Sequence, residues 1–211
     1  MTELLKMEGI AHSRRGKTGI TKFPDLVLRV GEAICITGAS GSGKSLLLKI
    51  AAGLLTPTEG SLRCETSSKA YVFVEDGLLQ NYSVWDNLML PLVFSRQQSG
   101  MEERAAKALE LFHLTNIKND TVGSLPEPPK RLLQYARAEV MQAKVLFIEE
   151  PLKNIRSDQY ATVRNWLQDY VQKNNGGCIF TSIQAEQWRF LQPKHIRLSG
   201  GGSSFKTEIN E

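Results

Sequence analysis

The sequence has few of the residues from which proteins build metal centres or disulfide frameworks. It contains three widely spaced cysteines, Cys35, Cys64 and Cys178, and three isolated histidines. There is no CxxC pair, and no histidine stands near a cysteine at the spacing of metal ligands. We therefore expect reduced cysteines in the core rather than disulfides or a structural zinc site.

Long apolar runs are also missing. No stretch approaches the ~20 residues that a helix needs to span a bilayer, and the start, MTELLKMEG, lacks the charged beginning and apolar centre of a signal peptide. We expect a soluble, cytosolic protein. The net charge of +4 and the pI near 9.0 suit an anionic ligand or an acidic surface, and equally a solvated basic face with no partner.

Short apolar stretches typical of strands alternate along the chain with stretches typical of helices. Strands are expected at 26–30, 33–37, 69–75, 144–151, 177–182 and 194–200, and helices at 44–55, 83–92, 100–114, 129–142 and 160–173. This alternation predicts an α/β fold with a mostly parallel sheet covered on both faces and an inserted helical lobe. We place the core in 1–83 and 131–200, the lobe in about 84–130, and a flexible Gly/Ser-rich tail in 201–211.

A phosphate-loop motif, GxxxxGK[ST], follows the second of these strands as GASGSGKS. Its glycines let backbone N–H groups converge on phosphate oxygens, Lys44 would reach the β- and γ-phosphates, and the Ser45 hydroxyl would bind Mg²⁺. A strand before the motif and a helix after it favour this interpretation over a Gly/Ser turn without a ligand. The expected nucleotide-binding residues are Gly38, Ala39, Ser40, Gly41, Ser42, Gly43, Lys44, Ser45 and Leu46.

Such a loop needs an acidic partner at the end of an apolar strand, and VLFIEEP supplies two candidates. Glu149 is expected to hold Mg²⁺ through water, so the metal residues are Ser45 and Glu149. Glu150 is expected to polarise the attacking water as the catalytic general base. Without the phosphate loop, the same pair could be two surface carboxylates at a strand end.

Taken in order, these motifs resemble an ATP-binding-cassette (ABC) ATPase, the nucleotide-binding subunit of ABC transporters, over nearly the whole chain. The matching segments are GEAICITGASGSGKSLLLKIAAGLLTPTEGSL, YVFVEDGLLQNYSVWDNLMLPL and VGSLPEPPKRLLQYARAEVMQAKVLFIEEPL. The resemblance implies a P-loop NTPase core with an antiparallel β edge, and ATP and Mg²⁺ as cofactors. It also implies a membrane permease as a partner, together with a second ATPase subunit or an identical copy.

Several motif positions depart from this family. Val74 stands where the family has a glutamine, which Glu75 could replace if the register slips by one residue. The signature Leu-Ser-Gly-Gly-Gln is replaced by LPEPP, residues 125–129. The other departures are Glu149 for an aspartate, Arg156 at or near a second aspartate, Ser182 for the switch histidine, and His12 as the one candidate to stack on adenine.

The altered signature bears most directly on hydrolysis. In the family, the signature of one subunit closes over the γ-phosphate held by the other. Here Pro128 and Pro129 have no N–H, Pro126 replaces the serine hydroxyl, and Glu127 adds a carboxylate. A lost charge-assisted hydrogen bond costs roughly 1.5–3 kcal/mol, so we expect weak or absent ATPase activity in the isolated chain. The helix should still form, because proline is favoured in a first turn.

The main functional hypothesis is an ATP-binding subunit of a membrane ABC complex with impaired hydrolysis, on the inner face of the cell membrane. The alternative is a non-transport pseudo-ATPase that uses ATP as a structural or switch ligand. A small phosphotransferase would need an Arg-rich lid, and the lobe offers only Arg96 and Arg104. Nucleic acid is not an expected partner, because the long coiled-coil insertion of DNA-repair relatives is missing.

Overall fold

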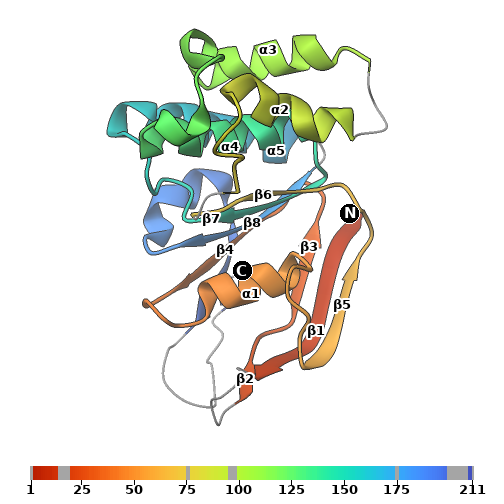
Figure 1. Ribbon diagram of the computed structural model, residues 1–211. Coiled ribbons are helices and arrows are strands. Elements are labelled where there is room, and N and C mark those ends of the chain that lie inside the picture. Colours follow the sequence, from red (N-terminus) through yellow and green to blue (C-terminus); the bar gives the residue numbers. More distant parts are fainter. Residues whose placement is uncertain are drawn as a thin grey trace. The chain divides into compact units, whose positions relative to one another are not determined.

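The computed structural model describes residues 2–13, 20–74, 77–94, 99–173, 176–198 and 209–210. Glu75, Arg96 and the expected tail, apart from residues 209 and 210, lie outside this set. The chain forms two compact units, each described here by itself (Figure 1). The first unit comprises 1–69, 144–151 and 168–211, and the second comprises 70–143 and 152–167.

An antiparallel sheet occupies one side of the first unit. Its central strand β1 (Glu3–Ser13) pairs with β2 (Ile20–Lys22), β3 (Leu26–Arg29) and β5 (Glu59–Cys64). Leu5, Met7, Ile10 and Leu28 are buried completely or nearly so. The periodicity of the sequence did not predict β1 as a strand, and the family resemblance alone implied an antiparallel edge.

A second, mostly parallel sheet carries the motif positions of this unit. Its strands lie in the order β10 (Ile209–Asn210), β9 (Lys194–Leu198), β4 (Ala33–Gly38), β8 (Gly177–Ser182) and β7 (Val145–Glu149). The pairs β9–β4, β4–β8 and β8–β7 are parallel, and β10 pairs with β9 antiparallel. The strands β4, β7 and β8 are almost entirely buried, as expected for parallel strands covered on both faces. The predicted P-loop NTPase α/β fold is confirmed.

The helix after the phosphate loop covers this sheet. Helix α1 (Lys44–Ala51) packs against β4, β7 and β8 through the buried side chains Leu47, Leu48, Ile50 and Ala51. It ends four residues before the predicted limit, and Gly53 then takes a left-handed φ of +77°. Because β4, β7 and β8 are parallel, their carboxyl ends share one edge, where the loop, the acidic pair and the short helix η4 (Ala185–Leu191) begin.

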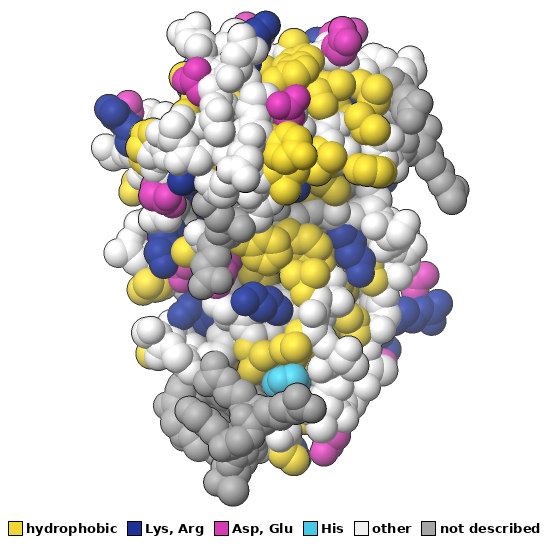
Figure 2. Space-filling view, in the orientation of Figure 1, with side chains coloured by type: hydrophobic (Ala, Val, Ile, Leu, Met, Phe, Trp, Pro, Cys, Tyr) yellow, Lys and Arg dark blue, Asp and Glu magenta, His cyan; other side chains and the backbone are white. Residues whose placement is uncertain are grey.

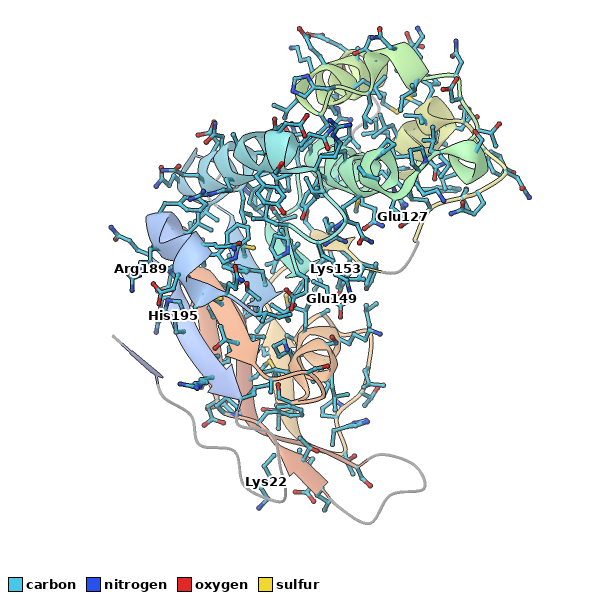
Figure 3. The ribbon with its side chains drawn as sticks, turned by 90° about the vertical axis from the view of Figure 1, so that its left-hand side faces the viewer. Lys22, Glu127, Glu149, Lys153, Arg189 and His195 are labelled. Carbon is cyan, nitrogen blue, oxygen red and sulfur yellow. The ribbon has the colours of Figure 1, made fainter. Side chains whose placement is uncertain are left out.

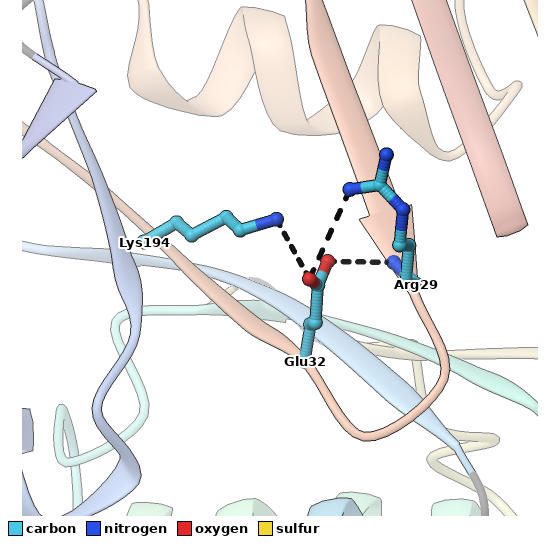
Figure 4. Close-up of polar contacts among 3 residues, drawn as sticks. All are labelled: Arg29, Glu32 and Lys194. Atoms are coloured by element: carbon cyan, nitrogen blue, oxygen red, sulfur yellow. Dashed lines mark hydrogen bonds and ion pairs between the residues drawn. The ribbon is translucent and has the colours of Figure 1, made fainter. Parts of the chain in front are cut away.

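A carboxylate connects the two sheets at their opposite end (Figure 4). Glu32 lies in the turn between β3 and β4, and its side chain is 17% exposed. It accepts hydrogen bonds from the Arg29 backbone N–H at 2.9 Å and from Lys194 Nζ of β9 at 2.7 Å. The Arg29 guanidinium adds an ion pair at 3.9 Å. These contacts hold the β3–β4 turn, and with it the start of β4, against β9.

The second unit is helical. It contains α2 (Val84–Val93), α3 (Met101–Leu111), α4 (Glu127–Met141), the first part of α5 (Tyr160–Lys173), and the short helices η1 (Thr115–Ile117), η2 (Val122–Ser124) and η3 (Ser157–Gln159). The strand β6 (Lys69–Val72) runs across the boundary between the units. Helix α4 begins two residues before the predicted start, because the prolines fit its first turn.

Three aromatic rings form the centre of the helical unit. Phe112, Tyr135 and Trp166 pack with ring centroids 5.2–6.0 Å apart. The Trp166 indole N–H donates to Glu139 Oε2 at 2.7 Å, so its polar atom is satisfied. Helix α2 starts with a capping box, in which Ser83 and Asp86 bond each other's backbone N–H. On α3, Ala105, Ala108 and Leu109 are buried, whereas Leu111 at the end of the helix is 40% exposed.

Candidate functional site

The phosphate loop leaves the end of β4 with a backbone that only glycine adopts readily. Gly38 has φ +149°, and a Cβ there would lie 2.6 Å from Ser42 Oγ and closer still to the Leu198 carbonyl. Gly43, at the N-cap of α1, has φ +96°. Both positions let the chain turn tightly between a buried strand and a buried helix.

The loop is prepared for an anion in three respects. Gly43 has no side chain to cap the first N–H groups of α1, and no acidic residue stands in that first turn. These N–H groups and the positive end of the helix therefore face the loop's interior. The Ser42 hydroxyl is 3% exposed and has no hydrogen-bond partner among the described residues. Lys44 Nζ folds back to donate to the carbonyls of Gly38 at 2.8 Å and Ala39 at 3.1 Å, which places its charge over the loop.

The predicted metal residues are in direct contact. The Ser45 hydroxyl donates to Oε1 of Glu149, 104 positions later in the chain. Glu149 is the last residue of β7, and Figure 3 shows it at the end of that strand. A hydroxyl and a carboxylate are oxygen ligands of the kind that Mg²⁺ takes beside phosphates. The side chains present therefore fit the metal.

Glu150 follows directly and has an unusual backbone. Its φ is +45°, and its N–H donates to Thr181 Oγ1 at 3.0 Å. A left-handed conformation is uncommon for a residue with a Cβ, and such strain is concentrated at functional sites. Burial, and secondarily the negative charge of Glu150, raise the pKa of the Cys35 thiol on β4 to about 12. The carboxylate of Glu150 is thus close enough to β4 for its charge to act there.

Ser182, at the position of the family's switch histidine, is directed into the protein. Its side chain is 5% exposed, and its Oγ accepts hydrogen bonds from the Gln184 N–H at 3.1 Å and from Trp188 Nε1 at 3.2 Å. It also donates to the Gln184 carbonyl at 3.2 Å. The hydroxyl serves to hold η4 against the end of β8.

The altered signature segment starts α4 in the second unit. Pro126 is the N-cap and offers no side-chain hydrogen bond, and Glu127 is the first helical residue. Since Pro128 and Pro129 follow, the first three helical positions carry a single N–H, that of Glu127. The Glu127 carboxylate is 61% exposed and pairs with Lys130 Nζ at 3.6 Å.

The structure also describes Val74, Arg156 and His12, which are other positions that depart from the family pattern. Val74 is half-buried, and Arg156 pairs with Asp158 at 3.1 Å. His12 lies opposite Thr21 in the β1–β2 pair, and its Nδ1 is buried with no hydrogen-bond partner among the described residues. Glu75 lies outside the described residues.

Sequence reasoning missed three residues of this region. Thr181 holds the Glu150 backbone, and Trp188 holds Ser182. The ring of Phe23 would lie 3.4 Å from a Cβ at Gly43, so it packs beside the loop. The two hydroxyl residues that end the apolar strand GCIFTS were a usable signal for Thr181. The sequence around Trp188 and Phe23 gives no indication of their contacts.

Among the helices that the structure describes, none has both the length and the apolar character required to cross a membrane.

The family model and the curated relatives that match this chain point to the same family. The family model described as "ABC transporter" matches residues 23–153. The sulfate/thiosulfate import ATP-binding protein CysA 1 of Agrobacterium fabrum is 26% identical over 208 residues, covering 87% of this chain and 60% of the relative. The taurine import ATP-binding protein TauB of Sinorhizobium fredii is 25% identical over 202 residues, covering 90% of this chain and 76% of the relative. The chain spans 60%, 46% and 52% of the lengths of the first three curated relatives.

Solved structures agree on the fold. The ATP-binding cassette MJ0796, in a dimeric post-hydrolysis state bound to ADP and Pi, matches with a TM-score of 0.85 at 20% identity, covering 98% of both chains. The cbiO1 protein of Clostridium perfringens, part of the ABC transporter complex cbiONQ, matches with a TM-score of 0.78 at 19% identity, covering 94% of this chain and 85% of that one. With a family match over more than half its residues, the chain belongs to the ABC transporter family.

Proposed function

We propose that this chain binds ATP with Mg²⁺ at residues 38–46 and acts as the ATP-binding subunit of a membrane transporter complex. The observation that carries the proposal is the contact between Ser45 and Glu149 beside a glycine-rich loop with no competing cap. Relatives named as ATP-binding proteins of sulfate, thiosulfate and taurine import support it.

Each group of the loop then has a role. The N–H groups at the start of α1 bind phosphate oxygens, and Lys44 exchanges its two loop carbonyls for the β- and γ-phosphates. Ser45 and Glu149 would hold Mg²⁺, the serine directly and the glutamate through water. Mg²⁺ neutralises phosphate charge when bound. Glu150 would accept a proton from an attacking water.

Hydrolysis is expected to be impaired even with a nucleotide in place. A helix start that offers one N–H and one carboxylate is a poor cap for a partner's triphosphate. The family has a glutamine side-chain amide and a histidine imidazole at two of these positions. Here Val74 and Ser182 replace them and supply neither group. Oriented donors of this kind are worth roughly 2.7–4 kcal/mol each in a transition state. A complex containing this chain would therefore depend on a second, intact ATPase subunit for turnover.

The helical unit offers a surface for a permease. Figure 2 shows apolar side chains gathered on this unit. Leu90, Val93 and Phe94, at the end of α2, are 38%, 49% and 81% exposed, and Leu79 and Tyr82 in the preceding loop are also exposed. Exposed apolar clusters mark interaction sites, and a cytoplasmic helix of a permease would cover this one. That contact would place the chain on the inner face of the cell membrane.

Lys44→Ala tests the nucleotide site directly. We expect affinity for Mg-ATP, measured by calorimetry, to fall at least tenfold, because charge-assisted hydrogen bonds to phosphate are lost. The matched control is Lys49→Ala, an exposed lysine in the last turn of the same helix, which should bind like the unaltered chain. Unchanged affinity in Lys44→Ala would mean that the site has been misidentified.

ATP hydrolysis and the identity of the partner protein are tested in separate experiments. The isolated chain should hydrolyse ATP slowly or not at all, and brisk turnover abolished by Glu150→Gln would refute impaired hydrolysis. A pull-down from native membranes should recover a permease. Recovery of a soluble partner alone would favour the pseudo-ATPase alternative.

A further inference from the structure

The ring of Phe23 packs against the glycine that starts α1. A Cβ placed on Gly43 would lie 3.4 Å from Cε1 and 3.7 Å from Cζ of this ring. Phe23 is 6% exposed, so protein rather than solvent surrounds its side chain. Gly43 is the N-cap of α1, its φ is +96°, and it has no side chain of its own to hold the first turn. The phenyl ring therefore supplies a side-chain contact at the point where the loop becomes a helix.

Phe23 stands on a short connection that is bonded to the central strand of the antiparallel sheet. Its N–H donates to the Ile10 carbonyl of β1 at 2.8 Å. Two residues later, Asp25 Oδ1 accepts a hydrogen bond from the Gly9 N–H of β1 at 2.7 Å. Pro24 stands between them, and its ring fixes one backbone dihedral of the connection. The backbone that carries the phenyl ring is therefore fixed to β1.

The position opposite Phe23 is also buried. Phe23 continues the antiparallel pairing of β2 with β1, which places it opposite Ile10, and Ile10 is 1% exposed. Side chains that are directly opposite in an antiparallel pair share one face of the sheet and contact each other. The antiparallel sheet thus reaches the phosphate loop of the other sheet through Phe23.

A loop rich in glycine benefits from such a contact. Gly41 and Gly43 both have positive φ values, +78° and +96°, and a Cβ on Gly41 would meet nothing within 4 Å. Glycine loses more conformational freedom on ordering than any other residue. Affinity for a ligand is lowered by the cost of ordering the groups that bind it. A fixed ring beside Gly43 reduces that cost, because it orders the end of the loop before the ligand arrives.

Building on the proposed nucleotide binding, we propose that Phe23 is a positioning residue of the phosphate site. It acts through Gly43, and it holds the N–H groups at the start of α1 in the direction that phosphate oxygens require. Phe23 itself does not touch the phosphates. The site then depends on a side chain outside residues 38–46, which the antiparallel sheet holds in place.

The test makes the same substitutions at two phenylalanine positions. Phe23→Leu and Phe23→Ala remove the ring beside the loop, and Phe112→Leu and Phe112→Ala remove a fully buried ring in the helical unit. All four variants should have a lower Tm, because each loses buried apolar volume. Mg-ATP affinity, measured by calorimetry well below Tm, should fall about threefold in Phe23→Leu and roughly tenfold or more in Phe23→Ala. It should stay within about twofold in both Phe112 variants.

The outcomes separate this inference from the proposed function. Folded Phe23 variants that bind Mg-ATP as tightly as the unaltered chain would overturn the inference and leave the proposed function standing. An equal loss of affinity in the Phe112 variants would do the same. If Phe23→Ala does not fold, the two leucine variants decide. Failure of the unaltered chain to bind Mg-ATP would contradict both the inference and the proposed function.

Amide hydrogen exchange of the nucleotide-free chain distinguishes positioning from direct contact with the nucleotide. The first hydrogen-bonded amide of α1 is that of Leu47, which donates to the Gly43 carbonyl at 2.8 Å. Phe23→Leu should speed exchange at this amide, because the helix start is less well held, and Phe112→Leu should not. Unchanged exchange at Leu47 together with weaker Mg-ATP binding would mean that the ring contacts the nucleotide itself, and would overturn the inference.

Discussion

Replacing Gly38 by alanine tests whether the loop depends on a close approach of its backbone to β9. The new methyl group would meet the Leu198 carbonyl and Ser42 Oγ, the latter at 2.6 Å, whereas real Cβ contacts essentially never fall below 3.0 Å. The first obstacle is the backbone of Leu198, a buried residue at the end of β9, and it cannot rotate away. The second is the hydroxyl at the base of the phosphate loop.

Two costs combine in this variant. A non-glycine residue at a φ of +149° costs about 1–3 kcal/mol, and forcing a methyl group into a filled space costs about 1–3 kcal/mol more. The sum is about 2–6 kcal/mol. For a chain of this size each kcal/mol lowers Tm by about 2–4 °C, so Tm should fall by roughly 4–24 °C. Mg-ATP affinity should be lost, because the loop must shift to admit the methyl group.

Gly31→Ala is the matched control. Gly31 also has a positive φ, +78°, but a Cβ there meets nothing within 4 Å. We expect only the backbone cost of about 1–2 kcal/mol and normal nucleotide affinity. Thermal unfolding and calorimetry on both variants separate the two effects. Equal Tm values for the two variants, with nucleotide affinity kept in Gly38→Ala, would refute the reasoning.

Three other predictions concern stability, thiol labelling and pH. Glu32→Ala removes the carboxylate that holds the β3–β4 turn against β9, and it should lower the free energy of unfolding by about 1–3 kcal/mol, seen as a lower Tm. The control Glu59→Ala, at an exposed position of β5, should change Tm little. Equal effects of the two variants would contradict the role given to Glu32. Burial raises the pKa of the Cys35 and Cys178 thiols above the ordinary value of 9.0, so a thiol reagent at pH 8 should label Cys64 first and the other two only on unfolding. The unfolded thiols ionise near 9 while the folded Cys35 thiol keeps its proton to about 12, so stability is complete below pH 9 and is lost as pH rises through that interval. Fast labelling of all three native thiols would contradict this.

The sequence by itself determined the features that depend on neighbouring residues. The strand Ala33–Gly38, the glycines of the phosphate loop and the helix after it follow from short-range rules on apolar runs, glycine conformations and helix starts. The loss of N–H groups at Pro128 and Pro129 is likewise a covalent property that no fold can restore. Helix ends were predicted less well, and the end of α1 was set too late.

Tertiary structure alone decided which distant residues meet. Ser45 reaches Glu149 across 104 positions, and Lys194 reaches Glu32 across 162, because the order and register of parallel strands bring them together. The sequence shows that Ser182 is not a histidine, but only the packing of Trp188 shows that its hydroxyl is fully used. Side-chain contacts of this kind depend on which strands are neighbours, and a pattern read along a single stretch of chain contains no information about that.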